Sequence, residues 1–138
     1  MEIAAKSADE TRRAGYQFGK SLKPGDVALL FGDLGSGKTT FTKGLAQALG
    51  IKEEITSPTF VFCKKYPMES GSLVHFDCYR IGSKEDAESI GLLEDLAKND
   101  EIIVIEWPEN IEEILPKNSK KVSFEYISEN ERKIIIND

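Results

Sequence analysis

The stretch GDLGSGKTT, residues 32–40, carries glycines, a lysine and hydroxyl side chains at the spacing Gly-x-x-x-x-Gly-Lys-Thr. This spacing is typical of a phosphate-binding loop, in which glycines let backbone N–H groups close around an anion. The lysine of such a loop reaches the outer phosphates, and the next hydroxyl serves Mg²⁺. We therefore predict that Lys38 contacts the β- and γ-phosphates of a nucleoside triphosphate, and that Thr39 is a magnesium ligand.

The sequence around this loop supports the same interpretation. Residues 26–31 form a short apolar run that predicts a buried strand, and residues 37–49 predict a helix. The helix shows apolar residues every four positions and is followed by Gly50, a typical stop. A strand entering the loop and a helix leaving it are the context that a phosphate-binding loop requires.

Two carboxylates follow apolar stretches elsewhere in the chain. LVHFD ends in Asp77 and IIVIE ends in Glu106. In a parallel sheet both acids emerge at the edge where ligands bind. One acid is then expected to hold the magnesium shell and the other to orient the attacking water, and the residues alone leave this assignment open. The structural alternative for either acid is a helix cap or an ion pair with Arg80.

Two other features have both a functional and a structural interpretation. Trp107, the sole tryptophan, directly follows Glu106 and either borders the metal site or packs in the core. The hydroxyl-rich segment Thr56 to Thr59 either senses a terminal phosphate or is a turn before a strand.

Length and composition limit the classes of function. With 138 residues, 40% hydrophobic and 30% charged, residues 1–138 are expected to form one domain. The formal charge of −6 disfavours broad nucleic-acid binding, which needs a positive surface. We see no apolar run of roughly 18 residues and no secretory signal, and we expect a soluble, cytoplasmic protein without membrane contact. Cys63 and Cys78 do not suggest a disulfide scaffold, so two buried thiols are expected. Together with His75 they lack metal-ligand spacing, which disfavours a structural zinc site.

Alternating strand and helix patterns predict an α/β protein. Ser7 and Glu10 have the spacing of a capping box at the start of the first helix. The remaining expected elements are a helix over 7–22, a hairpin of residues 57–67 and 71–81, a helix over 83–97, and strands over 101–109, 120–127 and 132–136.

Missing motifs narrow the reaction. The chain has no Asn-Lys-x-Asp signature of guanine nucleotide switches. It shows neither an arginine-bearing lid nor an acceptor pocket of the kind found in small-molecule kinases. Hydrolysis of ATP coupled to another process is favoured. A small P-loop kinase and a nucleotide-dependent binding module that hardly hydrolyses ATP stay open as alternatives.

The motifs GDLGSGKTT, TSPTF, HFDCYR and IEWPE, in this order and at these spacings, resemble the bacterial TsaE family. The resemblance extends from Thr11 to Arg132. It implies a P-loop three-layer sandwich with a mixed, largely parallel central sheet. It also implies a weak Mg-dependent ATPase that acts with TsaB and TsaD in forming threonylcarbamoyladenosine (t6A) in tRNA. Contact with tRNA would then be indirect, through that complex.

The resemblance also assigns residues. The phosphates would be bound by Gly35, Ser36, Gly37, Lys38, Thr39 and Thr40. Thr39 and Glu106 would serve Mg²⁺, Asp77 would lie near the γ-phosphate, and Thr11 and Arg132 would border the nucleotide. Lys38, Asp77 and Glu106 are the expected catalytic residues. Cys78 stands where the family commonly has leucine, so we expect its side chain to face the core.

Overall fold

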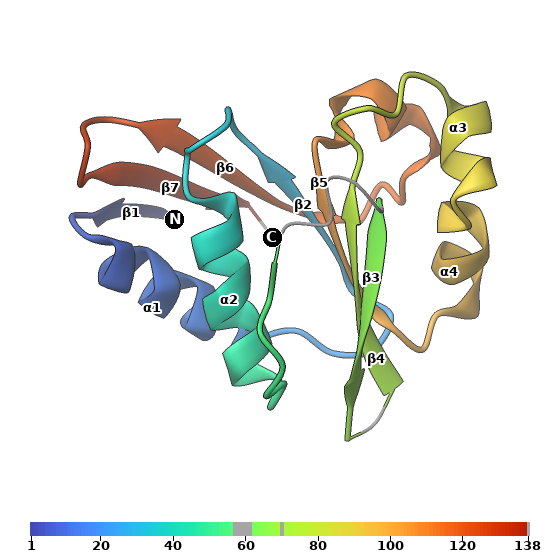
Figure 1. Ribbon diagram of the computed structural model, residues 1–138, viewed down its shortest axis with the longest axis horizontal. Coiled ribbons are helices and arrows are strands. Elements are labelled where there is room, and N and C mark those ends of the chain that lie inside the picture. The colour runs from blue at the N-terminus through green and yellow to red at the C-terminus, as the bar shows by residue number, and fades with distance from the viewer. Residues whose placement is uncertain (57–61, 70, 138) are drawn as a thin grey trace.

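A mixed sheet runs through the middle of the protein (Figure 1). The computed structural model describes residues 1–56, 62–69 and 71–137. Within them the strands are β1 (Glu2–Ala5), β2 (Val27–Phe31), β3 (Cys63–Met68), β4 (Gly71–Asp77), β5 (Ile102–Glu106), β6 (Lys120–Tyr126) and β7 (Arg132–Asn137). Their order across the sheet is β1-β7-β6-β2-β5-β4-β3. The neighbouring strands β6, β2, β5 and β4 run parallel, while β7, β1 and β3 pair antiparallel to their neighbours. The expected mixed, largely parallel sheet is confirmed.

Helices cover both faces of this sheet, which gives the expected three layers (Figure 1). One face carries α1 (Ala8–Lys20) and α2 (Lys38–Ala48). The other face carries α3 (Lys84–Ser89), α4 (Leu92–Lys98) and the 3₁₀ helix η1 (Pro108–Ile114). The described residues contain no helix long and apolar enough to cross a membrane.

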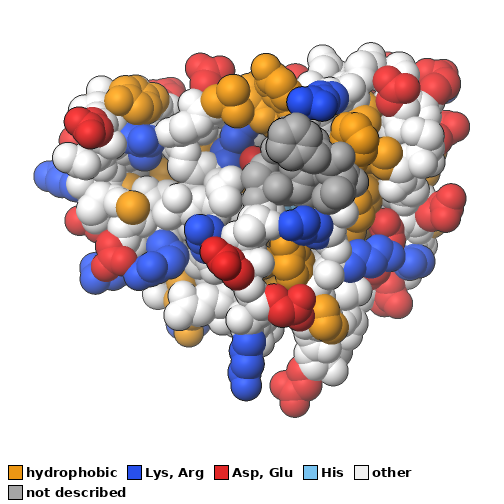
Figure 2. Space-filling model, in the orientation of Figure 1, with side chains coloured by type: hydrophobic (Ala, Val, Ile, Leu, Met, Phe, Trp, Pro, Cys, Tyr) orange, Lys and Arg blue, Asp and Glu red, His pale blue; other side chains and the backbone are white. Residues whose placement is uncertain are grey.

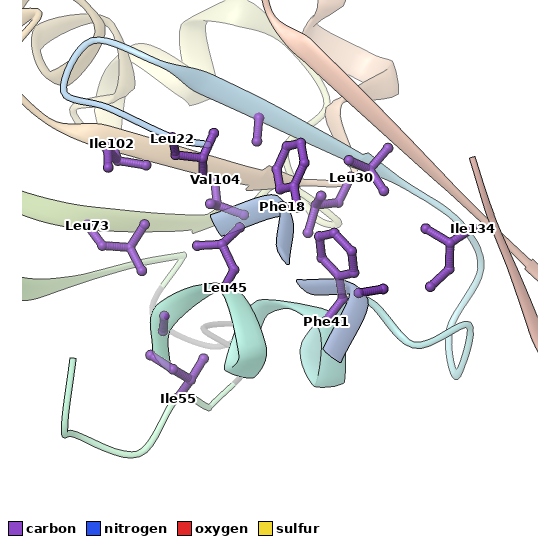
Figure 3. Close-up of a cluster of buried hydrophobic side chains, with 14 of the residues drawn as sticks. Phe18, Leu22, Leu30, Phe41, Leu45, Ile55, Leu73, Ile102, Val104 and Ile134 are labelled. Carbon is purple, nitrogen blue, oxygen red and sulfur yellow. The ribbon is translucent and has the colours of Figure 1, made fainter. Parts of the chain in front are cut away.

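The alternation of side chains along the central strands explains the two layers of core. Ile102 and Val104 of β5 pack in the cluster beneath α1 and α2, whereas Ile103 and Ile105 pack beneath α3, α4 and η1. Both sets are almost fully buried, so the strand appears in the sequence as a continuous apolar run. Figure 3 shows the first cluster, in which the Phe18 and Phe41 rings lie 5.6 Å apart between the helices and the sheet.

Helix α2, which follows the phosphate-binding loop, packs closely against α1 through two glycines. A Cβ atom added to Gly44 of α2 would lie 1.9 Å from the carbonyl oxygen of Arg12, and one added to Gly15 of α1 would lie 1.9 Å from that of Phe41. Only glycine fits at both positions. Ser7 caps α1 by accepting a hydrogen bond from the Glu10 N–H. The Glu10 carboxylate reaches back one residue further than a capping box does, to the N–H of Lys6.

The structure differs from the sequence expectations in several elements. Strand β1 was not predicted, and the helix expected over 83–97 is two helices because Gly91 adopts the left-handed conformation between them (φ 82°). The hairpin of β3 and β4 is confirmed. Strand β4 ends at Asp77 rather than at residue 81, because the Asp77 carboxylate accepts a hydrogen bond from the Tyr79 N–H and forms a turn. Residues 57–59 of the hydroxyl-rich segment lie outside the described residues.

Candidate nucleotide-binding site

The phosphate-binding loop joins the carboxyl end of β2 to the start of α2. Gly35 and Gly37 adopt left-handed backbone conformations, with φ of 77° and 107°. Residues with a Cβ atom rarely accept such values, so the glycine spacing of the sequence is a requirement of the loop path. Gly37 is the N-cap of α2, and no side chain caps this helix end. The first turn holds no acidic residue, which leaves the positive end of the helix dipole for an anion.

Lys38 is folded back over its own loop. The side chain is 5% exposed, and Nζ donates a hydrogen bond to the Gly32 carbonyl oxygen at 2.6 Å. Nζ also lies 3.7 Å from the centroid of the Trp107 ring, a cation–π contact. Burial lowers the pKa of Lys38, and the carboxylates of Glu106 and other nearby acids partly oppose this shift. The ammonium is therefore held near the loop by an uncharged carbonyl oxygen and an aromatic ring, which an incoming anion can replace.

The two acids predicted from the sequence lie side by side. Asp77 and Glu106 are paired positions of the parallel strands β4 and β5, and Glu106 is also paired with Leu30 beside the loop. Both carboxylates are buried, with 3% exposure each. Alternate residues of a strand share a face, so Asp77 lies on the same face as Leu73, and Glu106 on the same face as Ile102. Leu73 and Ile102 pack beneath α1 and α2, so both carboxylates lie on the face that α2 covers. The acids and the lysine of the loop therefore share one corner of the sheet.

A histidine that we did not single out for chemistry contacts one of these acids. Nε2 of His75 lies 2.5 Å from Oε2 of Glu106, and the histidine is fully buried. His75 precedes Asp77 by two residues on β4. A signal was present in the sequence, since positions two apart on a strand share a face.

A cavity of about 340 Å³ brings together most of the predicted residues. It is lined by Leu34, Gly35, Gly37, Lys38, Thr39, Thr40, Asp77, Glu106, Trp107 and Arg132. Thr11 does not line it. Thr11 instead lines a neighbouring cavity of about 110 Å³ that shares Gly37, Thr40 and Arg132 with the first. The two cavities meet at these shared residues.

Ser36 lines neither cavity, whereas Arg132 lines both and also contacts the loop. The Ser36 side chain lies beneath the loop, 1% exposed, and its Oγ has no hydrogen-bond partner among the described residues. The Arg132 guanidinium donates from Nε to the Gly35 carbonyl oxygen at 3.2 Å and stacks on the Tyr126 ring at 4.5 Å. Arg132 thereby ties the start of β7 to the loop. The expected core position of Cys78 is confirmed, with 0% exposure, whereas Cys63, also expected to be buried, is only half-buried.

These residues fit a magnesium–triphosphate group. The loop offers an uncapped helix end and an ammonium, both of which suit phosphate oxygens. In the part of the chain that the structure describes, no three His, Cys, Asp or Glu side chains form a metal cage. Mg²⁺ does not need one, because it commonly binds through one or two carboxylates, water and substrate phosphates. The hydroxyl of Thr39 and the carboxylate of Glu106 line the same cavity and match this set.

The sheet, the glycine loop and the two strand-end acids define a P-loop α/β protein. The sequence profile of the family described as "Threonylcarbamoyl adenosine biosynthesis protein TsaE" matches residues 5–134. The chain belongs to the TsaE family, and thus to the proteins of t6A modification of tRNA, where TsaE works with other Tsa proteins.

Individual relatives agree with the family match. The TsaE protein of Treponema pallidum is 40% identical over 136 residues, which cover 99% of each chain. That of Bacillus subtilis is 38% identical over 126 residues, or 91% of this chain and 78% of the relative. The crystal structure of Bacillus subtilis YdiB superposes with a TM-score of 0.82 at 33% identity, over 99% of this chain and 83% of that one.

Proposed function

We propose that the protein binds ATP with Mg²⁺ at the phosphate-binding loop, hydrolyses it slowly, and thereby supports turnover of a threonylcarbamoyl-transfer complex containing TsaB and TsaD. The observation that carries this proposal is the convergence of Lys38, Thr39, Asp77 and Glu106 on one cavity. A binding module with no hydrolytic task does not need two buried carboxylates beside its phosphate loop, because each costs free energy to bury.

Each residue is given one task. Lys38 exchanges its contacts with Gly32 and Trp107 for the phosphates of the nucleotide. Thr39 and Glu106 hold Mg²⁺, and bound Mg²⁺ supplies positive charge that stabilises the phosphoryl group during transfer. Asp77, on the neighbouring strand, orients the attacking water and accepts its proton.

The nucleoside end of ATP is assigned to the smaller cavity. Thr11 and Arg132 line it, and it meets the larger cavity at Gly37 and Thr40. A nucleotide whose phosphates lie on the loop would therefore extend toward the start of α1. The backbone of residues 35–40, rather than the buried Ser36 side chain, forms the phosphate cradle.

Slow hydrolysis follows from the charges around the cavity. Among the described residues that line the larger cavity, Arg132 is the sole arginine, and its guanidinium donates to carbonyl oxygens of Gly35, Ser128 and Glu131. An arginine supplied by a partner is worth about 10³ to 10⁵ in rate in other P-loop enzymes. We propose that the TsaB–TsaD pair completes the site by supplying charge or by ordering residues over the phosphate.

Contact with tRNA is assigned to that complex rather than to this chain. The net charge is −6. On the face seen in Figure 2, Lys and Arg side chains are scattered among Asp and Glu and form no continuous basic surface. Electrostatic attraction of a phosphate backbone needs such a surface.

The test is a phosphate-release assay on the protein alone and with TsaB and TsaD, combined with tracing of the labelled γ-phosphate. We expect slow release alone and a clear increase with both partners. Label transferred to an acceptor molecule would identify a kinase. ATP binding without release in either condition would identify a binding module.

A second measurement tests the coupling. A pull-down of TsaB and TsaD is made with ATP, a non-hydrolysable analogue, ADP or no nucleotide. Association should differ between these states, because a nucleotide can switch a partner only if the partner binds the states with different affinity. Equal association in all four conditions contradicts the coupling.

A further inference from the structure

His75 is the sole histidine of the chain and it is placed against Glu106 by the register of the sheet. His75 on β4 is paired with Val104 on β5, and Glu106 follows Val104 by two residues. Glu106 is therefore the diagonal neighbour of His75 on the same face, a position within reach of long side chains. The contact of 2.5 Å therefore follows from the pairing of β4, which also carries Asp77, with β5.

The surroundings of the pair fix the direction of the hydrogen bond. His75 is fully buried and Glu106 is 3% exposed. The Glu106 carboxylate offers only lone pairs, so Nε2 of His75 carries the hydrogen and donates it to Oε2. Nδ1 has no partner among the described residues, which suits a bare nitrogen better than a buried N–H group.

We propose that His75 is the positioning residue of Glu106: it holds one carboxylate oxygen, fixes the rotation of the group, and leaves the other oxygen for Mg²⁺. This inference rests on the proposed function, in which Glu106 serves the metal. Carboxylates that bind metals are commonly oriented by a second hydrogen-bonded group, and loss of that group typically costs about 10- to 100-fold in metal affinity or activity.

A purely structural role is the competing explanation. On that view His75 fills space between β4 and the helices, and Glu106 merely satisfies its nitrogen. The two roles differ in what a shape-preserving change does. Gln carries an amide nitrogen close to the position of Nε2 and keeps the donor, whereas Leu fills similar space without one. Only a positioning role makes metal binding depend on the donor.

The first experiment measures Mn²⁺ affinity by EPR in the presence of saturating ADP. The proteins are the wild type, His75→Leu, His75→Gln and Leu73→Ala. Leu73 is a fully buried neighbour on the same face of β4, so its variant controls for a weakened strand. We expect His75→Leu to lose about 10- to 100-fold in Mn²⁺ affinity. His75→Gln should recover most of the loss, and Leu73→Ala should match the wild type.

Affinity for ADP without metal is measured on the same proteins and should change little. Equal Mn²⁺ affinity of His75→Leu and the wild type overturns the inference while leaving the proposed function intact. Absence of Mn²⁺ binding by the wild type with ADP overturns the metal role of the proposed function, and the inference falls with it.

A second experiment needs no change at His75. Because the chain has one histidine, ¹⁵N-imidazole NMR gives an unambiguous signal for it. We expect the hydrogen on Nε2 in the wild type, and a change of the Nε2 resonance in Glu106→Gln and on addition of Mg²⁺ with ADP. This measurement decides the matter if His75→Leu does not fold. A hydrogen on Nδ1, or an Nε2 resonance unaffected by both changes, overturns the inference.

Discussion

The ammonium of Lys38 lies 3.7 Å from the centroid of the Trp107 ring, so the lysine of the phosphate loop rests on the residue that follows a proposed magnesium ligand. Trp107 is held in a left-handed conformation (φ 57°) and is packed edge-on by the Tyr79 ring at 4.8 Å. Such a conformation is uncommon for a bulky side chain and persists where the surroundings enforce it. The contact between Lys38 and Trp107 therefore links the phosphate-binding loop directly to the end of β5.

This contact predicts an optical signal for nucleotide binding. Addition of Mg²⁺ and ATP should draw Lys38 away from the ring and change the fluorescence of Trp107, the sole tryptophan. The measurement is an emission titration, with binding followed in parallel by calorimetry. The emission of Lys38→Ala should differ from that of the wild type before any nucleotide is added. Flat emission during confirmed binding would show that the contact survives in the complex.

Lys38→Ala should weaken ATP binding. Hydrogen bonds to charged groups are worth about 1.5 to 3 kcal/mol, which is roughly a ten- to hundredfold change in affinity. Isothermal calorimetry checks the value. Lys43→Ala is the matched control, because Lys43 lies on the same helix with an exposed side chain outside the larger cavity. Equal ATP affinity of Lys38→Ala and Lys43→Ala would remove Lys38 from the site.

Glu106→Gln should reduce hydrolysis more than nucleotide binding. The change keeps the shape of the side chain and removes its charge, which matters most when charge develops on the transferring phosphoryl group. Phosphate release and ATP affinity are measured over a range of Mg²⁺ concentrations, with Asp77→Asn in parallel. The Mg²⁺ dependence should shift in Glu106→Gln. If it shifts in Asp77→Asn alone, the roles of the two acids are reversed.

Gly44→Ala should destabilise the protein. The added Cβ atom would lie 1.9 Å from the backbone oxygen of Arg12, so α1 and α2 must move apart. Overpacking of this kind typically costs about 1 to 3 kcal/mol, and a backbone neighbour yields less readily than a side chain. Urea unfolding measures the loss. Gly82→Ala is the control, because the nearest atom to its Cβ, from the Asp86 side chain, lies 3.9 Å away. Equal stability of the two variants would contradict the close packing.

The parts of the site that could be predicted from the sequence are those set by local rules. The loop glycines, the apolar strands and the acids that end them depend on spacing within a few residues. These signals are sufficient to single out Lys38, Asp77 and Glu106. Their meeting in one cavity also followed, because the carboxyl ends of parallel strands share an edge.

Strand β1 and the contact of His75 with Glu106 could not be predicted, because both depend on contacts between distant segments of the chain. Strand β1 has four residues and exists through its antiparallel pairing with β7 at the other end of the chain. The contact of His75 with Glu106 needs the register of β4 on β5, which composition does not reveal. The break at Gly91 was a local signal, yet a single glycine inside a helical pattern is usually tolerated.

At the opposite end of β5, a buried carboxylate makes the stability of the protein depend on pH. Asp95 of α4 is buried, and its carboxylate lies 3.0 Å from Nζ of Lys65 on β3. Burial alone would raise the pKa of Asp95. Side-chain hydrogen bonds with Lys65, Glu101 and Lys98 together outweigh burial and lower the pKa below the ordinary 3.8. A lowered pKa means that the folded state gains stability above pH 3.8 and loses it as the pH falls through the folded value.

Asp95→Asn should therefore cost about 1.5 to 3 kcal/mol of unfolding free energy at pH 7, the value of a charged hydrogen bond. The deficit should shrink as the pH falls below 3.8. The pKa of Glu101 shifts in the opposite direction, because burial and the neighbouring Asp95 raise it above 4.5. The stability that this shift contributes is present at acid pH and is lost as the pH rises through the pKa of Glu101 in the folded state. The unfolding free energy of Glu101→Gln should therefore increase relative to that of the wild type toward neutral pH. Urea unfolding from pH 3 to pH 8 measures both variants, and a constant difference between Asp95→Asn and the wild type over this range would contradict the lowered pKa of Asp95.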